Sequence, residues 1–323
     1  MAKKRINDIQ PNSEFFVNTL IRFRPISPNN LDSLKSDRLY YSTPNNFNDP
    51  YDTLIYANYI QILRDINFNL ENGMEHYLKK LNDKDIPNAK LIAGYATAMW
   101  KGSKKNEMLN EFLKDICKTI RMLQEALRKN MKIICFTEEY LSMLMWSHYA
   151  DNHKGFAIIY DKNDTENAEN YTSVGELIRK KPILKQVTYA EKQSDLTSEV
   201  EEYIRAYRMT TLGDVTPPIP NLSQEKLRIM ITEKSPDWSY EKEWRIIPRH
   251  ISLEHESNLG YMSIKPKGII IGSMCSEESQ RQLIDICDKK IIPVFKAEIN
   301  YWEPGYKLEL MEPERVLSGI IEK

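Results

Sequence analysis

The segment EKSPDWSYEKEWRII, Glu233–Ile247, combines aromatic and charged side chains and ends in an apolar run typical of a buried strand. Successive side chains of a strand point to opposite faces. We therefore expect Glu241, Glu243 and Arg245 to share one face of a β-strand, with their aromatic neighbours on the other. Such a charged stripe is either a solvated face of a sheet or part of a functional site.

The composition restricts the class of protein. The chain has 323 residues and a formal net charge of -1, so it has room for one large domain or two ordinary ones and no general attraction to nucleic acid. The four cysteines are scattered singly, which predicts no zinc or redox motif. The sequence has neither the apolar core of a signal peptide nor an apolar run of the roughly 20 residues that cross a bilayer. We expect a cytoplasmic protein without a membrane partner.

Strand-like segments come from distant parts of the chain, whereas helix-like segments are grouped. From Ile55 to about Asn130 the apolar residues fall at helical spacing, which predicts a helical insertion at about residues 55–130. Strands gathered from distant segments and helices grouped apart indicate an α+β fold. We expect a single domain over residues 1–323, with a central antiparallel-rich mixed sheet. The main strand candidates are Phe16–Ile26, Met131–Glu139, Lys154–Asp161 and Leu184–Lys192.

The loop STPNNFNDP, Ser42–Pro50, is rich in asparagine and aspartate. These side chains cap helices and fold back on the backbone in Asx turns, which is a sufficient structural reason for them. Asn48 and Asp49 nevertheless follow a phenylalanine in a pattern that also suits a binding loop.

A second cluster lies in MWSHYADNHKGFAIIYD, Met145–Asp161. On a helix, Met145, His148 and Tyr149 occupy positions i, i+3 and i+4 and share one face. His148 lacks the second ligand at i+4 that a metal-binding helix would show, so we expect no metal there. We expect His148 to be a hydrogen-bonded, packed support of a cleft, together with Trp146.

The glutamate pair offers acid–base chemistry. Two neighbouring carboxyl groups beside aromatic side chains are expected to differ in pKa, with one raised and the other still ionised. That arrangement suits a general base or the stabilisation of a cationic transition state. A solvated sheet face with Arg245 neutralising Glu241 and Glu243 is the competing interpretation.

Four separated motifs resemble the bacterial family known as domain of unknown function 2971, over about residues 20–310. Some members of that family lie among phage-defence genes, so the resemblance implies a defence or toxin-type effector. The motifs are RFR at Arg22–Arg24, FNDPYD at Phe47–Asp52, MWSHYADNHKG at Met145–Gly155 and WSYEKEWR at Trp238–Arg245.

A weaker resemblance is to ADP-ribosyltransferases of the Arg/Ser/Glu type. It implies an ADP-ribosyltransferase-like fold and NAD as the substrate of a transferase or glycohydrolase. The residues that carry it are Arg22 or Arg24, then Ser42 and Thr43 or Thr137, then Glu241 and Glu243.

Cleavage of the glycosidic bond of NAD develops positive charge on the ribose, which a carboxylate stabilises. The resemblance implies this role for Glu243, acceptor activation by Glu241, and stacking of Tyr149 or Trp146 on nicotinamide. An N-terminal arginine would hold the pyrophosphate. The candidate site has Glu241, Glu243 and His148 as catalytic residues, and Arg22, Arg24, Ser42, Thr43, Asn48, Asp49, Trp146, Tyr149, Tyr240 and Arg245 as substrate-binding residues.

Two other functions fit the same residues. In a metal-dependent nuclease or phosphodiesterase, Asp49, Glu241, Glu243 and Lys234 would gather around magnesium. In a noncatalytic sensor, the same cleft would bind a phage component. Metal dependence separates the first alternative from an NAD-using enzyme, and loss of NAD separates the second. The acceptor, whether protein or nucleic acid, and a partner or antitoxin protein are not specified by the sequence.

Overall fold

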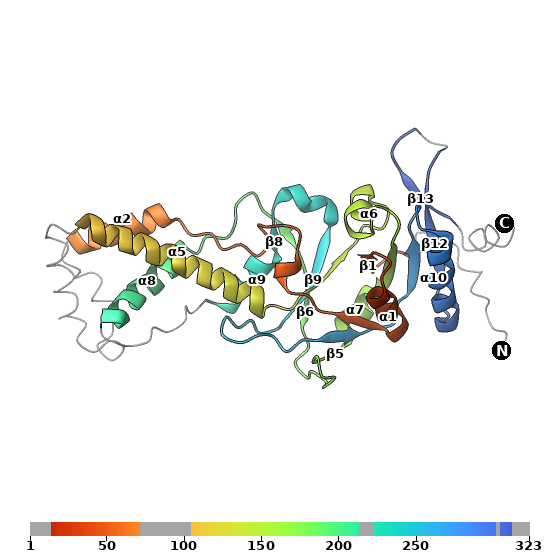
Figure 1. Ribbon diagram of the computed structural model, residues 1–323, viewed down its shortest axis with the longest axis horizontal. Coiled ribbons are helices and arrows are strands. Elements are labelled where there is room, and N and C mark those ends of the chain that lie inside the picture. Colours follow the sequence, from red (N-terminus) through yellow and green to blue (C-terminus); the bar gives the residue numbers. More distant parts are fainter. Residues whose placement is uncertain (1–13, 72–104, 213–221, 302–303, 312–323) are drawn as a thin grey trace.

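An eight-stranded mixed sheet forms the centre of the computed structural model, which describes residues 14–71, 105–212, 222–301 and 304–311 (Figure 1). The strand order is β13-β12-β11-β4-β1-β3-β9-β6, and neighbouring strands are antiparallel except β11 and β12. The predicted α+β class and antiparallel-rich mixed sheet are confirmed. The strands are β1 (Thr19–Arg24), β3 (Ile134–Thr137), β4 (Phe156–Asp161), β6 (Ile183–Gln186), β9 (Glu243–Ile247), β11 (Gly268–Ile271), β12 (Val294–Ile299) and β13 (Leu308–Met311).

The central strands are apolar on both faces because both faces are covered. Leu20 of β1 packs in a core with Leu34 of α1 and Leu283 of α10, whereas Ile21 packs in a second core with Trp146 of α6. Short strands and helices complete this region. They are α1 (Pro28–Ser36), β2 (Arg38–Tyr40), η2 (Pro44–Asn46), α6 (Met143–Tyr149), α7 (Lys162–Asn167), β5 (Glu169–Tyr171), β7 (Thr188–Tyr189), β8 (Glu233–Lys234), η3 (Pro236–Glu241), β10 (Tyr261–Ser263) and α10 (Glu277–Lys290).

Strands β1 and β3 separate near the middle of the sheet. In the described chain their register comprises one pair, Ile21 with Thr137, although both strands continue beyond it. Strand β1 keeps full pairing with β4 on its other side, and β3 keeps full pairing with β9. The sheet therefore divides into two parts that meet at a single point.

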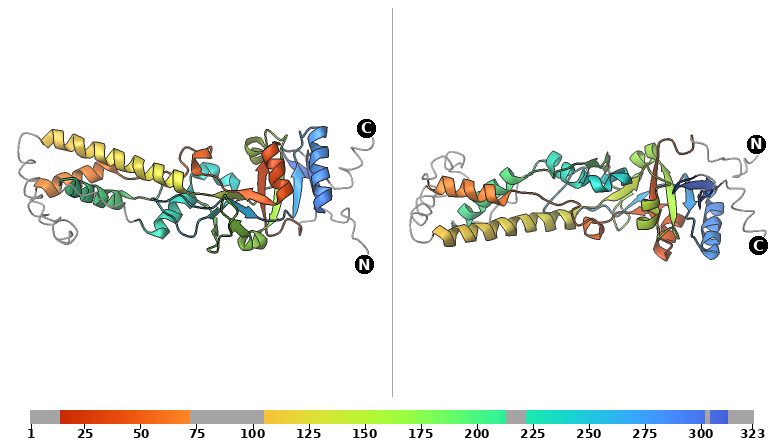
Figure 2. Two further views of the ribbon diagram at one scale, coloured as in Figure 1. Left: turned by 60° about the horizontal axis from the view of Figure 1, so that its bottom comes forward. Right: turned by 90° about the horizontal axis from the view of Figure 1, so that it is seen from above.

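The helical part extends away from the sheet as an arm (Figures 1 and 2). Helices α2 (Tyr59–Glu71) and α5 (Lys105–Asn130) belong to the predicted insertion, while its residues 72–104 lie outside the described chain. Helix α8 (Thr197–Leu212) comes from a later segment and lies beside α2 and α5. The arm is thus assembled from two segments, and α9 (Gln224–Thr232) joins its core through Leu227. None of the helices in the described ranges is long and apolar enough to cross a membrane.

The segment Glu233–Ile247 departs from the predicted strand. Ser235 and Pro236 begin the 3-10 helix η3, because the Ser235 side chain accepts a hydrogen bond from a backbone N–H of its first turn. The helix ends at Glu241, and Lys242 adopts a left-handed conformation with φ 41°. The prediction that Tyr240 and Glu241 lie on the strand is therefore wrong. The alternation holds only from Glu243 onward.

Candidate functional site

A pocket of about 410 Å³ lies where β1 and β3 separate. This volume falls within the range of roughly 300–1,000 Å³ that small-molecule sites occupy. Its walls come from both strands, from the loop after η2, from α6 and from the end of η3. Predicted site residues that line it are Arg22, Arg24, Ser42, Asn48, His148, Tyr149, Glu241 and Glu243. The structure thus brings together residues from all four sequence motifs.

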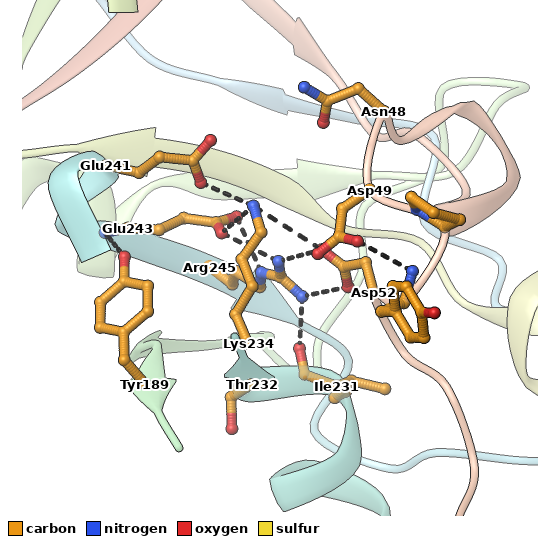
Figure 3. Close-up of polar contacts among 12 residues, drawn as sticks. Asn48, Asp49, Asp52, Tyr189, Ile231, Thr232, Lys234, Glu241, Glu243 and Arg245 are labelled. Carbon is orange, nitrogen blue, oxygen red and sulfur yellow. Dashed lines mark hydrogen bonds and ion pairs between the residues drawn. The ribbon is translucent and has the colours of Figure 1, made fainter. Parts of the chain in front are cut away.

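Arg245 forms the buried centre of an ion-pair cluster beneath the pocket (Figure 3). Its guanidinium group donates to both carboxylate oxygens of Glu243 at 2.8 and 2.9 Å and to both of Asp52 at 2.9 and 2.5 Å. A further bond of 2.8 Å runs to the backbone oxygen of Ile231. The side chain has no exposed surface, so this geometry gives Arg245 a supporting role in place of the predicted contact with substrate.

Lys234 lies between the carboxylates of the cluster. Its Nζ is 2.6 Å from Glu241 Oε2, 3.4 Å from Glu243 Oε2 and 4.0 Å from Asp52 Oδ2. Burial alone would lower the pKa of Lys234, but the charges of Glu243 and Glu241 raise it above its ordinary value. Lys234 is therefore a fixed positive charge between the two glutamates.

The two glutamates differ in the direction of their pKa shifts, because the cations of the cluster act more strongly on Glu243 than on Glu241. Burial would raise the pKa of Glu243, but the charges of Arg245 and Lys234 lower it to about 2. Burial raises the pKa of Glu241 above its ordinary value, and Lys234 only partly opposes this effect. Glu243 is thus held ionised by the cluster, while Glu241 has the carboxyl group suited to exchange a proton.

Glu241 is also tied to the opposite wall of the pocket. Tyr149 Oη donates a hydrogen bond of 2.6 Å to Glu241 Oε1, and Asn48 Nδ2 donates one of 3.1 Å to Tyr149 Oη. Burial and the charge of Glu241 raise the pKa of Tyr149, so its hydroxyl stays protonated and can donate. Thr137 Oγ1 donates to the backbone oxygen of Glu241 and fixes the end of η3. Hydrogen bonds from three distant segments therefore fix Glu241, one of them directly at its carboxyl group.

Close approach of two backbones places α6 against β1. Gly155 follows α6, and a Cβ atom on it would lie 2.2 Å from the backbone oxygen of Arg24. Only glycine permits this approach. The packing brings Tyr149 near the end of β1, so the arginines of β1 and the Glu241–Tyr149 pair face the same pocket.

Arg22 and Arg24 supply the positive end of the pocket. Arg22 is 8% exposed, and its Nε and Nη1 have no hydrogen-bond partner among the described residues. Its remaining nitrogen donates to the backbone oxygen of Tyr40 at 3.4 Å. Burial lowers the pKa of Arg22, and burial together with the charge of Arg22 lowers the pKa of Arg24 to about 9. Neither guanidinium has a carboxylate within ion-pair distance in the described part of the chain.

The predictions for Trp146 and His148 have different outcomes. Trp146 has no exposed surface and donates from Nε1 to the backbone oxygen of Tyr140 at 2.9 Å, so its predicted role as a packed support is confirmed and its alternative role, stacking on a ligand, is wrong. His148 is exposed at the pocket, and no hydrogen bond to its ring occurs among the described residues, so its predicted packed and bonded role is also wrong. Its ring centroid lies 6.3 Å from that of Tyr149 and 6.5 Å from that of Tyr240.

The remaining predicted residues lie at the margins. Ser42 lines the pocket and accepts a hydrogen bond of 3.3 Å from Asn46. The described residues that line this pocket do not include Thr43 or Tyr240, and Tyr240 packs beside His148 at its edge. Asp49 faces a different, neighbouring pocket.

Sequence reasoning missed the importance of Asp52 and gave Lys234 a role only around a metal. Asp52 is 1% exposed and lies 193 positions before its partner Arg245, a separation that no local pattern reveals. The quoted motifs hold more carboxylates than arginines, and this excess is the signal that the sequence offers. Within the ranges described, no three metal-ligating side chains are grouped as a metal site, and Lys234 Nζ lies among the carboxylates where a cation would bind.

Comparison with known proteins identifies one related segment. Residues 145–246 match a family model, and this interval includes Tyr149 of α6, Lys234 of β8 and Glu241 of η3. No curated protein and no solved structure matches the chain. The segment that supplies most of the carboxylate end of the site is therefore similar to the family described as Protein of unknown function (DUF2971).

Proposed function

We propose that this pocket is the active site of an enzyme that cleaves the N-glycosidic bond of a phosphorylated nucleotide, with NAD as the substrate. One observation carries the proposal: the buried guanidinium of Arg22, two of whose nitrogens have no hydrogen-bond partner among the described residues, lines the same pocket as the Glu241 carboxyl group held by Tyr149. The arginine end of the pocket suits the phosphate groups of such a substrate, and the glutamate end suits its glycosidic bond.

The arginine end supports a phosphate ligand. A buried guanidinium without a hydrogen-bonded anion is unfavourable, because both its charge and its N–H groups are removed from water. Phosphate and pyrophosphate oxygens accept from guanidinium groups in a bidentate manner. Arg22 and Arg24 would thus hold the pyrophosphate of NAD, as the sequence resemblance implies.

The glutamate end supports glycosidic cleavage, with a change in the predicted roles. Both oxygens of Glu243 accept hydrogen bonds from Arg245, so Glu243 is committed to the cluster. Glu241 takes the role beside the ribose. The C1′–N bond breaks with its electron pair on nicotinamide, which leaves neutral, and Glu241 stabilises the developing positive charge. The attacking oxygen forms the new bond to C1′, and its proton passes to the Glu241 carboxylate.

The aromatic side chains at the pocket edge support stacking of the leaving group. Tyr149 lines the pocket, and the exposed ring of His148 lies next to it. These rings replace Trp146 as the surface for nicotinamide. The defence or toxin-type role, the cytoplasmic location and the ADP-ribosyltransferase-like fold rest on the sequence alone.

Incubation of the full chain with NAD, followed by mass spectrometry for nicotinamide, tests the proposal. We expect nicotinamide release by the wild type and by Glu278→Gln, which changes an exposed carboxylate on α10. Glu241→Gln should lower the release by about two orders of magnitude or more. Inorganic pyrophosphate should compete with NAD for the arginines and inhibit the wild type, and Arg22→Met should abolish this inhibition. Nucleic-acid cleavage that requires magnesium, without release of nicotinamide, would overturn the proposal in favour of a nuclease.

A further inference from the structure

A second pocket, of about 740 Å³, adjoins the first at Lys234, which lines both. Its walls come from residues 49–56, from the segment 190–195 ahead of α8, and from residues 233–238 around β8 and η3. The proposed glycosidic chemistry uses none of these residues except Lys234.

Acidic side chains outnumber basic ones in the described lining of the second pocket. None of its carboxylates has a basic partner within ion-pair distance in the part of the chain that the structure describes. Lys234 forms ion pairs with Glu241 and Glu243. Lys192 is the other basic residue in the described lining, and it forms no ion pair with a described residue. Five acidic residues line the pocket: Asp49, Glu191, Asp195, Glu233 and Asp237.

Asp49 is the buried member of this set. It is 3% exposed, and its Oδ1 accepts a hydrogen bond of 2.8 Å from the backbone N–H of Tyr51 (Figure 3). Its Oδ2 has no hydrogen-bond partner among the residues described. A buried carboxylate oxygen without a donor is unfavourable. A cationic donor that enters the pocket would remove this deficiency.

Aromatic side chains complete the lining. Tyr51 is 66% exposed and Tyr56 is 42% exposed, and Trp238 lines the pocket between β8 and the end of η3. Aromatic faces attract ammonium and guanidinium groups. The ring of Trp238 already has such a contact, because Lys234 Nζ lies 4.6 Å from its centroid.

We propose that the second pocket binds an organic cation, namely an alkyl guanidinium or alkyl ammonium group, with Asp49 as its buried ionic partner. Unpaired carboxylates attract the charge, and exposed tyrosine rings cover the alkyl part. The same carboxylates repel nucleic acid. The group can belong to a free small molecule or to an arginine or lysine side chain of a peptide.

Calorimetric titration of the full chain with N-butylguanidinium and with its neutral isostere N-butylurea tests the proposal. We expect butylguanidinium to bind and butylurea not to bind. Asp49→Asn keeps the acceptor for the Tyr51 N–H but removes the charge, so binding should weaken by about thirtyfold or more. Glu278→Gln, on α10 and outside the pocket, should bind as the wild type does.

A second variant and a second probe make the outcome unambiguous. Tyr51→Ala changes an exposed side chain, and weaker binding by this variant supports the site even if Asp49→Asn fails to fold. An acetylated, amidated Gly-Arg-Gly peptide that binds at least as tightly as butylguanidinium identifies a peptide side chain as the ligand, whereas weaker binding identifies a free cation. Equal binding of butylurea, absence of binding, or displacement of butylguanidinium by an equal concentration of calcium would overturn the proposal.

Discussion

The Glu243→Gln substitution removes one negative charge from a buried cluster and keeps the size of the side chain. In the folded protein Arg245 and Lys234 hold the pKa of Glu243 at about 2, against an ordinary value of 4.5. This difference is about 2.5, and each pKa unit corresponds to about 1.4 kcal/mol. The interactions that depend on the charge of Glu243 therefore contribute about 3.5 kcal/mol to the free energy of unfolding.

The sign of the pH dependence follows from the same values. Because the pKa of Glu243 is depressed in the folded state, its contribution is fully present above the unfolded value near 4.5. The contribution is lost as the pH falls through about 2. Urea unfolding at pH 7 should show Glu243→Gln less stable than the wild type by about 3.5 kcal/mol. The two proteins should approach one another as the pH falls through this window.

The matched control is Glu278→Gln, because Glu278 is exposed on α10 and makes no ion pair to a described residue. This variant should unfold at the same urea concentration as the wild type. If Glu243→Gln were as stable as the wild type at pH 7, with the same pH dependence, then Glu243 would not be held by Arg245 and the ion-pair cluster would be wrong.

Two further substitutions separate catalysis from packing. Tyr149→Phe removes the hydroxyl that donates to Glu241, so nicotinamide release should fall by about tenfold to hundredfold with an unchanged unfolding midpoint. Unchanged turnover by this variant would contradict the role of the hydroxyl. Trp146→Ala empties a fully buried position and should lower the free energy of unfolding by about 3–5 kcal/mol. A urea midpoint equal to that of the wild type would show that the indole is not part of the core.

The strands and α6 could be predicted from the sequence because their apolar patterns are local. The apolar run of β1 and the helical spacing of Met145 and Tyr149 both appear as expected. The end of η3 could not be predicted in the same way. The alternation of charges around Lys242 resembles that of a strand. Only Ser235 and Pro236, which cap and begin a helix, indicate that a helical turn precedes the strand.

The sequence predicts most of the residues that line the candidate site, but it predicts less well what each of them does there. Arg22 and Glu241 do line one pocket, although they are far apart in the sequence. Other roles differ from the prediction: Arg245 is buried in a cluster with Asp52, and His148 is exposed at the pocket. Such outcomes depend on which distant side chains reach one another, and a single sequence does not contain that information.

The single pair that joins β1 to β3 has a mechanical consequence. One part of the sheet carries the two arginines, and the other carries Glu243 and the adjoining Glu241, so the two ends of the pocket are joined by a single strand pair. A molecule that bonds to Arg22 at one end and to Glu241 at the other would act as a brace across this joint. Its binding should slow amide hydrogen exchange at the inner edges of both strands.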